Sequence, residues 1–431
     1  MSSTIDWPTF LLKELQAPEK YALNGGPFGS KLVCRDYTPT GIPVIRGANL
    51  SGDARFSLEG FVYVSEEKAD ELLPNNAHPG DLIFTQRGTL GQVGIIPRGC
   101  GYDRFVISQS QMKLTVDEAK ADSQFLYYYF RAPETLQSIE NLAISSGVPH
   151  INLDILRHFS VRLPPLPTQR KIAAILSTYD DLIENNTRRI AALEEMTRLL
   201  YREWFVHFRF PGYEDVAMVD SELGPIPEGW EVVKVTDAVE VNPRMKVPKE
   251  GEKPYVPMKS LSKTSMLIQR IESRVGNSGS KFKNNDTLFA RITPCLENGK
   301  TGFVQFLESD DAVALGSTEF IVLRSKTLSP EHVCLMARSD ELRDLAIKSM
   351  TGATGRQRVQ VACFDEFMIA HPDQATLEHF VAQVQPMFRN ISSLAERNEV
   401  LRRTRDLLLP RLISGEVDVL ELEINVGGLD A

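Results

Sequence analysis

The stretch LPPLPTQRKIAAILSTYDDLIENN, residues 163–186, decides the fold, because a long helical pattern starts there directly after three closely spaced prolines. Proline fixes φ and lacks an N–H, so a helix tolerates it only in or before its first turn. Beyond Pro167 the mostly apolar positions recur four and three residues apart, which is typical of a coiled-coil seam. These positions are Ile172, Leu176, Tyr179, Ile183, Asn186, Ile190, Leu193, Thr197, Leu200 and Trp204.

The pattern occurs a second time, because Phe380 follows Ile172 by 208 positions and the later seam positions keep this offset. The second seam runs through Phe380, Val384, Met387, Ile391, Leu394, Asn398, Leu401, Arg405 and Leu408. The segments before the helices repeat as well, since PGDLIFTQRG at 79–88 resembles NNDTLFARIT at 284–293. Each long helix therefore follows an equivalent globular segment.

A chain of 431 residues is expected to hold two or more domains, because single cores rarely grow beyond about 300 residues. We predict an α+β protein with two similar α/β domains separated by two long antiparallel coiled-coil helices, arranged with pseudo-two-fold symmetry. Each helix alone would expose a strip of Ile and Leu, and packing the strips together buries both. The expected segments are 1–163 (first domain), 164–210 (first long helix), 211–374 (linker and second domain), 375–415 (second long helix) and 416–431 (acidic tail).

Two asparagines interrupt the apolar seams. Asn186 and Asn398 either fix the register of the helix pair, a known use of a buried Asn, or are simply tolerated polar core sites. The seam from Ile172 to Leu200 would span about 42 Å at the rise of an α-helix.

The charge distribution excludes a uniformly basic nucleic-acid binder, because the formal net charge is −9 and the pI is about 5.5. Residues 244–300 nevertheless hold twelve Lys or Arg against five acids. This window favours one anion-facing surface, with an ordinary solvated face as the alternative.

The five cysteines are scattered without C-x-x-C spacing, so neither a disulfide framework nor a metal site is expected. The first residues, MSSTIDWPTF, lack the features of a signal peptide, and no apolar run is long enough to span a membrane. We therefore expect a cytoplasmic protein that does not contact membranes.

Motifs for catalysis are missing from the sequence. PCLENGKTG at 294–302 ends like a phosphate-binding loop, but Pro294 occupies the position of the first glycine and offers no N–H to a phosphate. The sequence also lacks an adenine-methyltransferase N-P-P-[FY] signature, a G-x-S-x-G elbow and an H-E-x-x-H zinc motif. The pattern favours a reader or a scaffold, and we expect no catalytic residue and no metal site.

Three stretches resemble one known family. LPPLPTQRKIAAILSTYDDLIENNTRRIAALEEMTRLLYREWFV at 163–206 resembles the central conserved region of the specificity subunits of type I restriction-modification enzymes. RNEVLRRTRDLLLPRLISGEVDV at 397–419 resembles their distal conserved region, and SELGPIPEGWEVVKV at 221–235 resembles the start of their second target-recognition domain. One departure is IAHPDQATLEHF at 369–380, which lacks the prolines and the Gln-Arg pair of the first connector.

The resemblance implies that each domain is a target-recognition domain that reads one half of a bipartite site on double-stranded DNA. It also implies that catalysis lies in partners: two modification (methyltransferase) subunits and, where the system restricts DNA, translocase/endonuclease (restriction) subunits. No cofactor is then expected on this chain, since S-adenosylmethionine, ATP and Mg belong to the partner subunits. Helices about 42 Å long would place the half-site centres about 10 to 12 base pairs apart.

The candidate DNA-contacting residues are donors in glycine-containing loops and at strand ends, because Arg, Lys, Gln and Asn read base edges and phosphates. They are Arg46, Asn49, Thr85, Gln86, Arg87, His150, Asn152, Lys259, Arg291, Lys300, Arg356, Gln357 and Arg358. In each case a water-satisfied loop or a surface salt bridge is the alternative. For the whole chain, the alternatives are a protein-binding coiled-coil scaffold and a metal-dependent nuclease with an unrecognised site.

Overall fold

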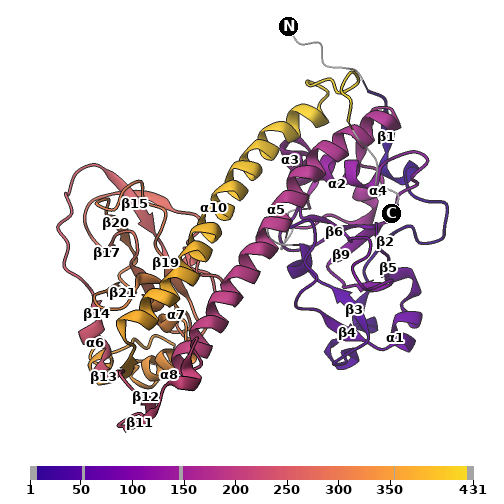
Figure 1. Ribbon diagram of the computed structural model, residues 1–431. Coiled ribbons are helices and arrows are strands. Elements are labelled where there is room, and N and C mark those ends of the chain that lie inside the picture. Colours follow the sequence, from indigo (N-terminus) through magenta and orange to yellow (C-terminus); the bar gives the residue numbers. More distant parts are fainter. Residues whose placement is uncertain (1–6, 51–53, 145–148, 354, 425–431) are drawn as a thin grey trace. The chain divides into compact units, whose positions relative to one another are not determined.

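The computed structural model describes residues 7–50, 54–144, 149–353 and 355–424. It consists of two compact units, which are treated separately below. The first unit contains Met1–Glu184 and Glu399–Ala431, and the second contains Asn185–Asn398. Each unit combines one α/β domain with part of both long helices (Figure 1).

The domain of the first unit is built on two four-stranded sheets. The antiparallel sheet has, in spatial order, β2 (Leu23–Gly25), β9 (Gln111–Leu114), β6 (Leu82–Thr85) and β7 (Val93–Ile95). The mixed sheet has β4 (Val62–Val64), β3 (Ile42–Ile45), β8 (Phe105–Ile107) and β5 (Asn76–Ala77), with β3 parallel to β8. A short pair, β1 (Thr9–Leu11) with β10 (Ser160–Arg162), joins the two ends of the domain.

The domain of the second unit repeats this topology strand for strand. Its antiparallel sheet has β14 (Val239–Val241), β21 (Phe320–Ser325), β18 (Thr287–Ala290) and β19 (Thr301–Phe303). Its mixed sheet has β16 (Glu272–Val275), β15 (Glu252–Val256), β20 (Ala314–Gly316) and β17 (Ser280–Phe282), and its end pair is β13 (Glu231–Lys234) with β22 (Met368–His371). The repeat seen in the sequence is therefore a repeat of fold.

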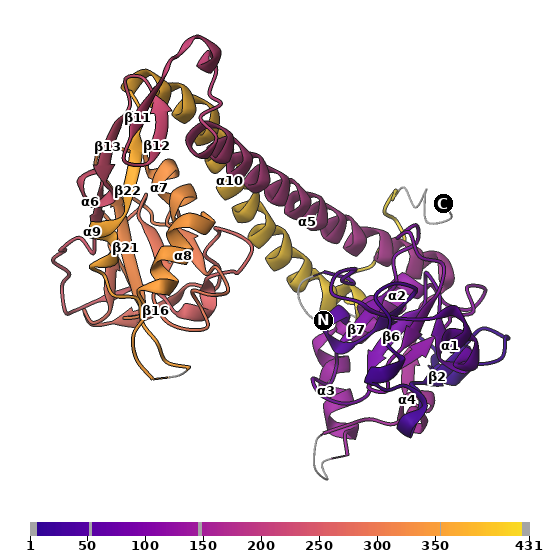
Figure 2. The same ribbon diagram turned by 90° about the horizontal axis from the view of Figure 1, so that it is seen from below.

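Three short helices follow the last strand of the four-stranded sheets in each domain, and one further short helix lies at a different place in each. The first domain has α1 (Glu66–Glu71), α2 (Ser123–Arg131), α3 (Pro133–Leu142) and α4 (Leu153–Arg157). The second has α6 (Val235–Ala238), α7 (Pro330–Ala337), α8 (Asp340–Lys348) and α9 (Cys363–Glu366), seen in Figure 2. Ser329 caps α7 by accepting a hydrogen bond from the His332 N–H, as its sequence predicts.

The core of the first unit lies between the antiparallel sheet, α2 and the long helices. Leu126 and Phe130 of α2 are fully buried and Tyr129 is nearly so, and their helical spacing places all three on the core face of α2. The same cluster includes Ile172 and Leu176 of the first long helix. The domain and the helix segment of the unit thus share one apolar core.

The long helices are α5 (Leu166–Tyr201) and α10 (Gln374–Ile413). In the second unit Asn186 lies against Asn398 and the Trp204 ring lies 5.6 Å from the Phe380 ring, centroid to centroid. The numbering rises along one helix as it falls along the other, so the pair is antiparallel. The predicted α+β fold with paired long helices is confirmed.

Most predicted seam residues are buried. The buried ones are Ile172, Leu176, Ile183, Ile190, Thr197, Trp204, Phe380, Val384, Ile391, Leu394, Asn398 and Arg405. The half-buried ones are Tyr179, Asn186, Leu193, Leu200, Met387, Leu401 and Leu408. The Asn186 Nδ2 donates to the Asn398 Oδ1 at 2.9 Å, so the two polar seam positions satisfy each other.

The segments outside the helices add two features. The Gly- and Pro-rich linker forms a hairpin of β11 (Met218–Ser221) and β12 (Gly224–Pro227). The acidic tail begins by packing on the first unit, where Val419 is buried and the Lys171 Nζ donates to the Leu420 carbonyl at 2.7 Å. The tail residues 425–431 lie outside the described residues. The compact units divide both long helices, and the domain boundaries expected from the sequence stay a prediction.

Candidate DNA interface

In the first domain, two predicted loops lie next to each other. The turn after β6 carries Gln86 and Arg87, and the loop after α3 leads to His150. Arg87 forms an isolated β-bridge with His150, and the Ile151 N–H donates to the Gln86 carbonyl at 3.1 Å. The structure therefore brings together Arg87 and His150, which lie 63 positions apart in the sequence. The preceding loop residues 145–148 lie outside the described residues.

The second domain repeats this junction. Arg358 forms a bridge with Ile292, and the Val359 N–H donates to the Arg291 carbonyl at 2.9 Å. The Thr293 N–H donates to the Gln357 carbonyl at 3.1 Å. Arg291 and Arg358 thus occupy the places that Gln86 and His150 occupy in the first domain, and Ile292 occupies the place of Arg87.

One exposed arginine at each junction is uncommitted. Arg87 and Arg356 are exposed, and neither guanidinium forms a hydrogen bond or ion pair with another described residue. The Arg356 turn depends on Gly352, whose φ is +127° and whose Cβ, if present, would lie 3.1 Å from the Arg356 carbonyl oxygen. Both guanidinium groups are available for a phosphate or the edge of a guanine.

Arg358 is exposed but already paired. Its Nε and NH2 atoms donate to the two carboxylate oxygens of Glu319 at 2.9 and 2.7 Å. This fork-shaped contact lowers the pKa of Glu319 and keeps the carboxylate charged. Glu319 was missed by the sequence analysis, because nothing in its own segment indicates a partner 39 positions away. The pair holds the Arg358 head in place, so Arg358 and Arg356 differ in their freedom to reach DNA.

Three of the candidates have side-chain groups engaged within the fold, and their DNA contact stays a prediction. Asn49 is 1 % exposed, accepts from the Arg46 N–H and donates to the Ser57 and Glu59 carbonyls. Thr85 is 3 % exposed within β6. The Asn152 side-chain oxygen caps α4 by accepting from the Ile155 N–H at 2.8 Å. The Asn49 and Asn152 side chains bond backbone groups and so shape their loops, whereas the Thr85 hydroxyl donates to the Gln92 side chain.

The remaining candidates form backbone or surface contacts. The Lys300 Nζ donates to the Met258 carbonyl at 3.1 Å, which places Lys300 beside Lys259. The Lys259 Nζ lies 2.7 Å from a carboxylate oxygen of Glu272, and both side chains are exposed. The Arg46 guanidinium donates to the Gly60 carbonyl at 2.6 Å. Exposed pairs of this kind contribute little and exchange readily for phosphate contacts.

The comparisons with known proteins agree with this geometry. Residues 10–195 match the family described as the type I restriction modification DNA specificity domain. The MjaIX type I restriction enzyme specificity subunit of Methanocaldococcus jannaschii is 25% identical over 380 residues, which cover 84% of this chain and 85% of that protein. Over most of its length the chain is similar to type I restriction enzyme specificity subunits.

Two further similarities fit the specificity-subunit family. The HindI specificity subunit of Haemophilus influenzae is 25% identical over 382 residues, covering 73% of this chain and 82% of that protein. The crystal structure of the type I restriction-modification S subunit from M. genitalium aligns with a TM-score of 0.57 and 14% identity, covering 95% of this chain and 96% of that chain. The structural likeness confirms the fold.

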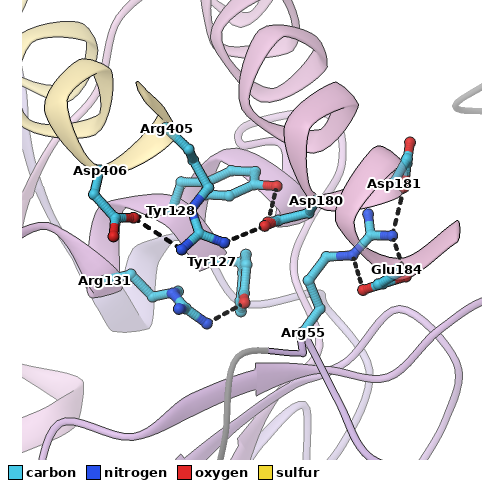
Figure 3. Close-up of polar contacts among 9 residues, drawn as sticks. All are labelled: Arg55, Tyr127, Tyr128, Arg131, Asp180, Asp181, Glu184, Arg405 and Asp406. Carbon is cyan, nitrogen blue, oxygen red and sulfur yellow. Dashed lines mark hydrogen bonds and ion pairs between the residues drawn. The ribbon is translucent and has the colours of Figure 1, made fainter. Parts of the chain in front are cut away.

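In the first unit the domain is fastened to the long helices by a buried ionic network (Figure 3). Arg405 of α10 forms an ion pair with Asp180 of α5, with side-chain exposures of 7% and 4%, and the Tyr128 hydroxyl donates to Asp180 at 2.7 Å. Burial and the adjacent Asp180 carboxylate raise the pKa of Tyr128 well above its usual value. Next to them, Arg55 donates to Glu184 at 2.9 and 3.0 Å.

The network determines how the recognition loops are supported. Tyr128 belongs to α2, so the α2 helix is tied to α5 and, through Asp180, to α10. Moving either partner of this buried ion pair would leave an uncompensated charge, so the pair holds Arg405 and Asp180 in one relative position. The loops of the first domain therefore rest on a rigid base.

Within the described residues, no group of three or more His, Cys, Asp or Glu side chains could hold a metal ion. Among those same residues, no helix is long and apolar enough to cross a membrane.

Proposed function

We propose that the chain is the DNA sequence-recognition subunit of a type I restriction-modification complex and reads a bipartite target with its two domains. The observation that carries this proposal is the repeated junction of two loops, which presents Arg87 in one domain and Arg356 in the other. A scaffold that binds only proteins has no need for two copies of such a cationic loop junction. The chain itself is not a catalyst; it positions the subunits that are.

The proposed DNA surface consists of exposed or partly exposed donors in each domain. In the first domain it comprises Arg46, Gln86, Arg87 and His150, and in the second Lys259, Arg291, Lys300, Arg356, Gln357 and Arg358. Arg87 and Arg356 make the direct contacts, whereas Arg358 and Lys259 first exchange a carboxylate for a phosphate. Different side chains on one common scaffold suit two different half-sites.

The partners in this proposal are double-stranded DNA, two modification subunits and, in a restricting system, translocase/endonuclease subunits. The outer surface of the long helices supports protein docking, because several large apolar side chains are exposed there. They are Leu182, Met196, Leu199, Val400 and Leu407. This chain binds no cofactor; S-adenosylmethionine, ATP and Mg are held by the partners, in the cytoplasm.

The proposed segments follow the sequence boundaries. Residues 1–163 and 211–374 form the two target-recognition domains with the linker, 164–210 and 375–415 form the central and distal conserved helices, and 416–431 form the tail.

The test is methylation by the reconstituted complex. Methylome sequencing of a host that expresses the chain with its modification subunit should reveal a two-part adenine motif. The Arg356→Ala variant should lose methylation at that motif while the complex still assembles. Unchanged methylation by this variant would remove Arg356 from the surface, and DNA turnover by the purified chain alone, with Mg²⁺ and with or without S-adenosylmethionine, would refute the non-catalytic role.

A further inference from the structure

A cavity of about 420 Å³ lies in the second unit, between the second domain and α10. The domain contributes Gln305, Glu331 and Phe303 to its wall, and α10 contributes Arg389 and Glu396, among others. The volume is within the range of sites that hold a small ligand or an inserted side chain. We call this space the α10 cavity.

Two polar groups in the wall of the α10 cavity have no partner. Glu331, in the first turn of α7, is only 4% exposed, and its Oε2 atom makes no hydrogen bond within the described part of the chain. The side-chain nitrogen of Gln305 is likewise buried and unpartnered among these residues. A buried carboxylate without a partner is unfavourable, so the site favours a cation that can reach it.

The first unit shows what fills the equivalent space. With the offset of 208 residues, Asp181 and Glu184 of α5 correspond to Arg389 and Ser392 of α10. The Arg55 guanidinium occupies that place in the first unit, donating to both Asp181 and Glu184 with its side chain only 21% exposed. The first groove is therefore closed by an arginine of the chain itself.

The second unit lacks this arginine. The Arg55 carbonyl accepts from the Ile95 N–H, and at the equivalent strand position the Met266 carbonyl accepts from the Phe303 N–H. Met266 corresponds to Arg55 but is 1% exposed and uncharged. The second groove thus has an unpartnered acid, and the guanidinium in its wall, that of Arg389, donates to Gln385 instead.

We propose that the α10 cavity receives an arginine side chain from a partner polypeptide, with the guanidinium on Glu331. Glu396 adds a second acid against the one Arg389, and Arg389 is already directed to Gln385 by a hydrogen bond of 2.7 Å. The edge-to-face rings of Phe303 and Phe388, 5.1 Å apart, add aromatic surface to the wall. A polypeptide fits better than a free amine, because its backbone carbonyl satisfies the Gln305 donor.

The test measures binding of N-acetylarginine amide to the full chain by ligand-detected NMR. We expect saturable binding with half-saturation at about 1 mM, typical of a single anchored side chain. The neutral isostere N-acetylcitrulline amide should not bind, and agmatine, which lacks the carbonyl groups, should bind more weakly. Glu331→Gln should weaken binding of the arginine probe at least tenfold, whereas the matched control Glu297→Gln, at an exposed position, should leave it unchanged.

A second variant keeps the proposal testable if the Glu331→Gln variant does not fold. Ser392→Arg supplies a guanidinium from α10 itself and should abolish probe binding while raising the melting temperature. Equal binding by the wild type and both cavity variants would overturn the proposal, as would the absence of binding to the wild type up to about 10 mM.

The source of the arginine is tested in the assembled complex. With the modification subunits bound, the probe should be excluded from the cavity. Persistent binding would overturn the assignment of the arginine to these subunits. Only the experiment with the modification subunits rests on the proposed function. Its failure can therefore be distinguished from an absence of probe binding to the isolated chain.

Discussion

The buried pair of Arg405 and Asp180 gives a prediction whose size follows from the structure. Replacing Arg405 by Met leaves Asp180, with its side chain 4% exposed, with the Tyr128 hydroxyl as its remaining hydrogen-bonded side chain in Figure 3. Breaking a buried ion pair from one side lowers the free energy of unfolding by about 3 to 5 kcal/mol. For a cooperative unit of about 200 residues, this corresponds to a fall in melting temperature of roughly 6 to 20 °C.

The control replaces the whole network. The triple variant Asp180→Leu, Tyr128→Phe and Arg405→Met removes all three polar groups together, so no buried charge is left unpaired; Asp406, the other partner of Arg405, is exposed to solvent. We expect it to unfold within about 2 kcal/mol of the wild type, because apolar replacements of buried ion pairs are often close to neutral. The second unit supports this expectation, since the positions equivalent to Asp180 and Arg405 are the buried Phe388 and Thr197.

The assay is urea unfolding followed by circular dichroism, with calorimetry to separate the transitions of the two units. The single variant should shift one transition and leave the other in place. A loss below about 1 kcal/mol for Arg405→Met, or a triple variant less stable than the single one, would refute the claim that the pair is buried and mutually dependent.

Three further predictions concern DNA, pH and helix register. If the guanidinium of Arg87 or Arg356 binds a phosphate, its replacement by Ala should reduce by about 0.9 the steepness with which the logarithm of the DNA-binding constant falls with the logarithm of the salt concentration. An unchanged slope together with an altered sequence preference in a DNA-binding titration would instead indicate a base contact. Burial lowers the pKa of His332 to about 3 from an ordinary value of 6.5, so the neutral ring stabilises the fold above pH 6.5, and the free energy of unfolding should fall by about 2 kcal/mol between pH 7 and pH 5. His332→Phe should reduce this pH dependence in unfolding titrations, and an unchanged pH profile of the variant would contradict the prediction. Replacing Asn186 and Asn398 together by Leu should raise the melting temperature but allow the helices to pair in other ways. Light scattering would detect these pairings as additional oligomers. An unchanged oligomeric state would favour the interpretation that the asparagines are only tolerated.

The sequence predicts the repeated architecture well because the repeat is carried by many positions at once. The seam from Ile172 to Leu200 and its copy keep their spacing, and a spacing of four and three residues has one simple structural solution. The core stripe of α2 is predictable for the same reason. In such cases many weak preferences point to one fold, and a single exception such as Asn186 changes little.

The site is less predictable, because each polar side chain has local competitors for its hydrogen bonds. Asn49 and Asn152 have the residue type expected for a base contact, yet a loop carbonyl and a helix N-terminus use their side chains instead. Arg356 and Arg358 stand two positions apart, but only Arg358 has Glu319 within reach. Which arginine is free depends on a residue from another strand, and no local pattern contains that information.

The contrast between the two halves then has a functional consequence. The topology of each domain is fixed by buried strands and by α2 or α7, so the exposed turns can change without loss of the fold. Arg87 lies two residues beyond the end of β6, whereas Arg356 lies in a turn that depends on Gly352, so in the proposed interface the two cations would approach DNA from different backbone conformations. Two domains with a common fold and different loops can recognise different half-sites. The long helices differ as well, because Arg55 occupies the groove in the first unit, whereas the corresponding groove in the second unit is open. A subunit with such halves is symmetric in its frame but not in its contacts, as an asymmetric bipartite target requires.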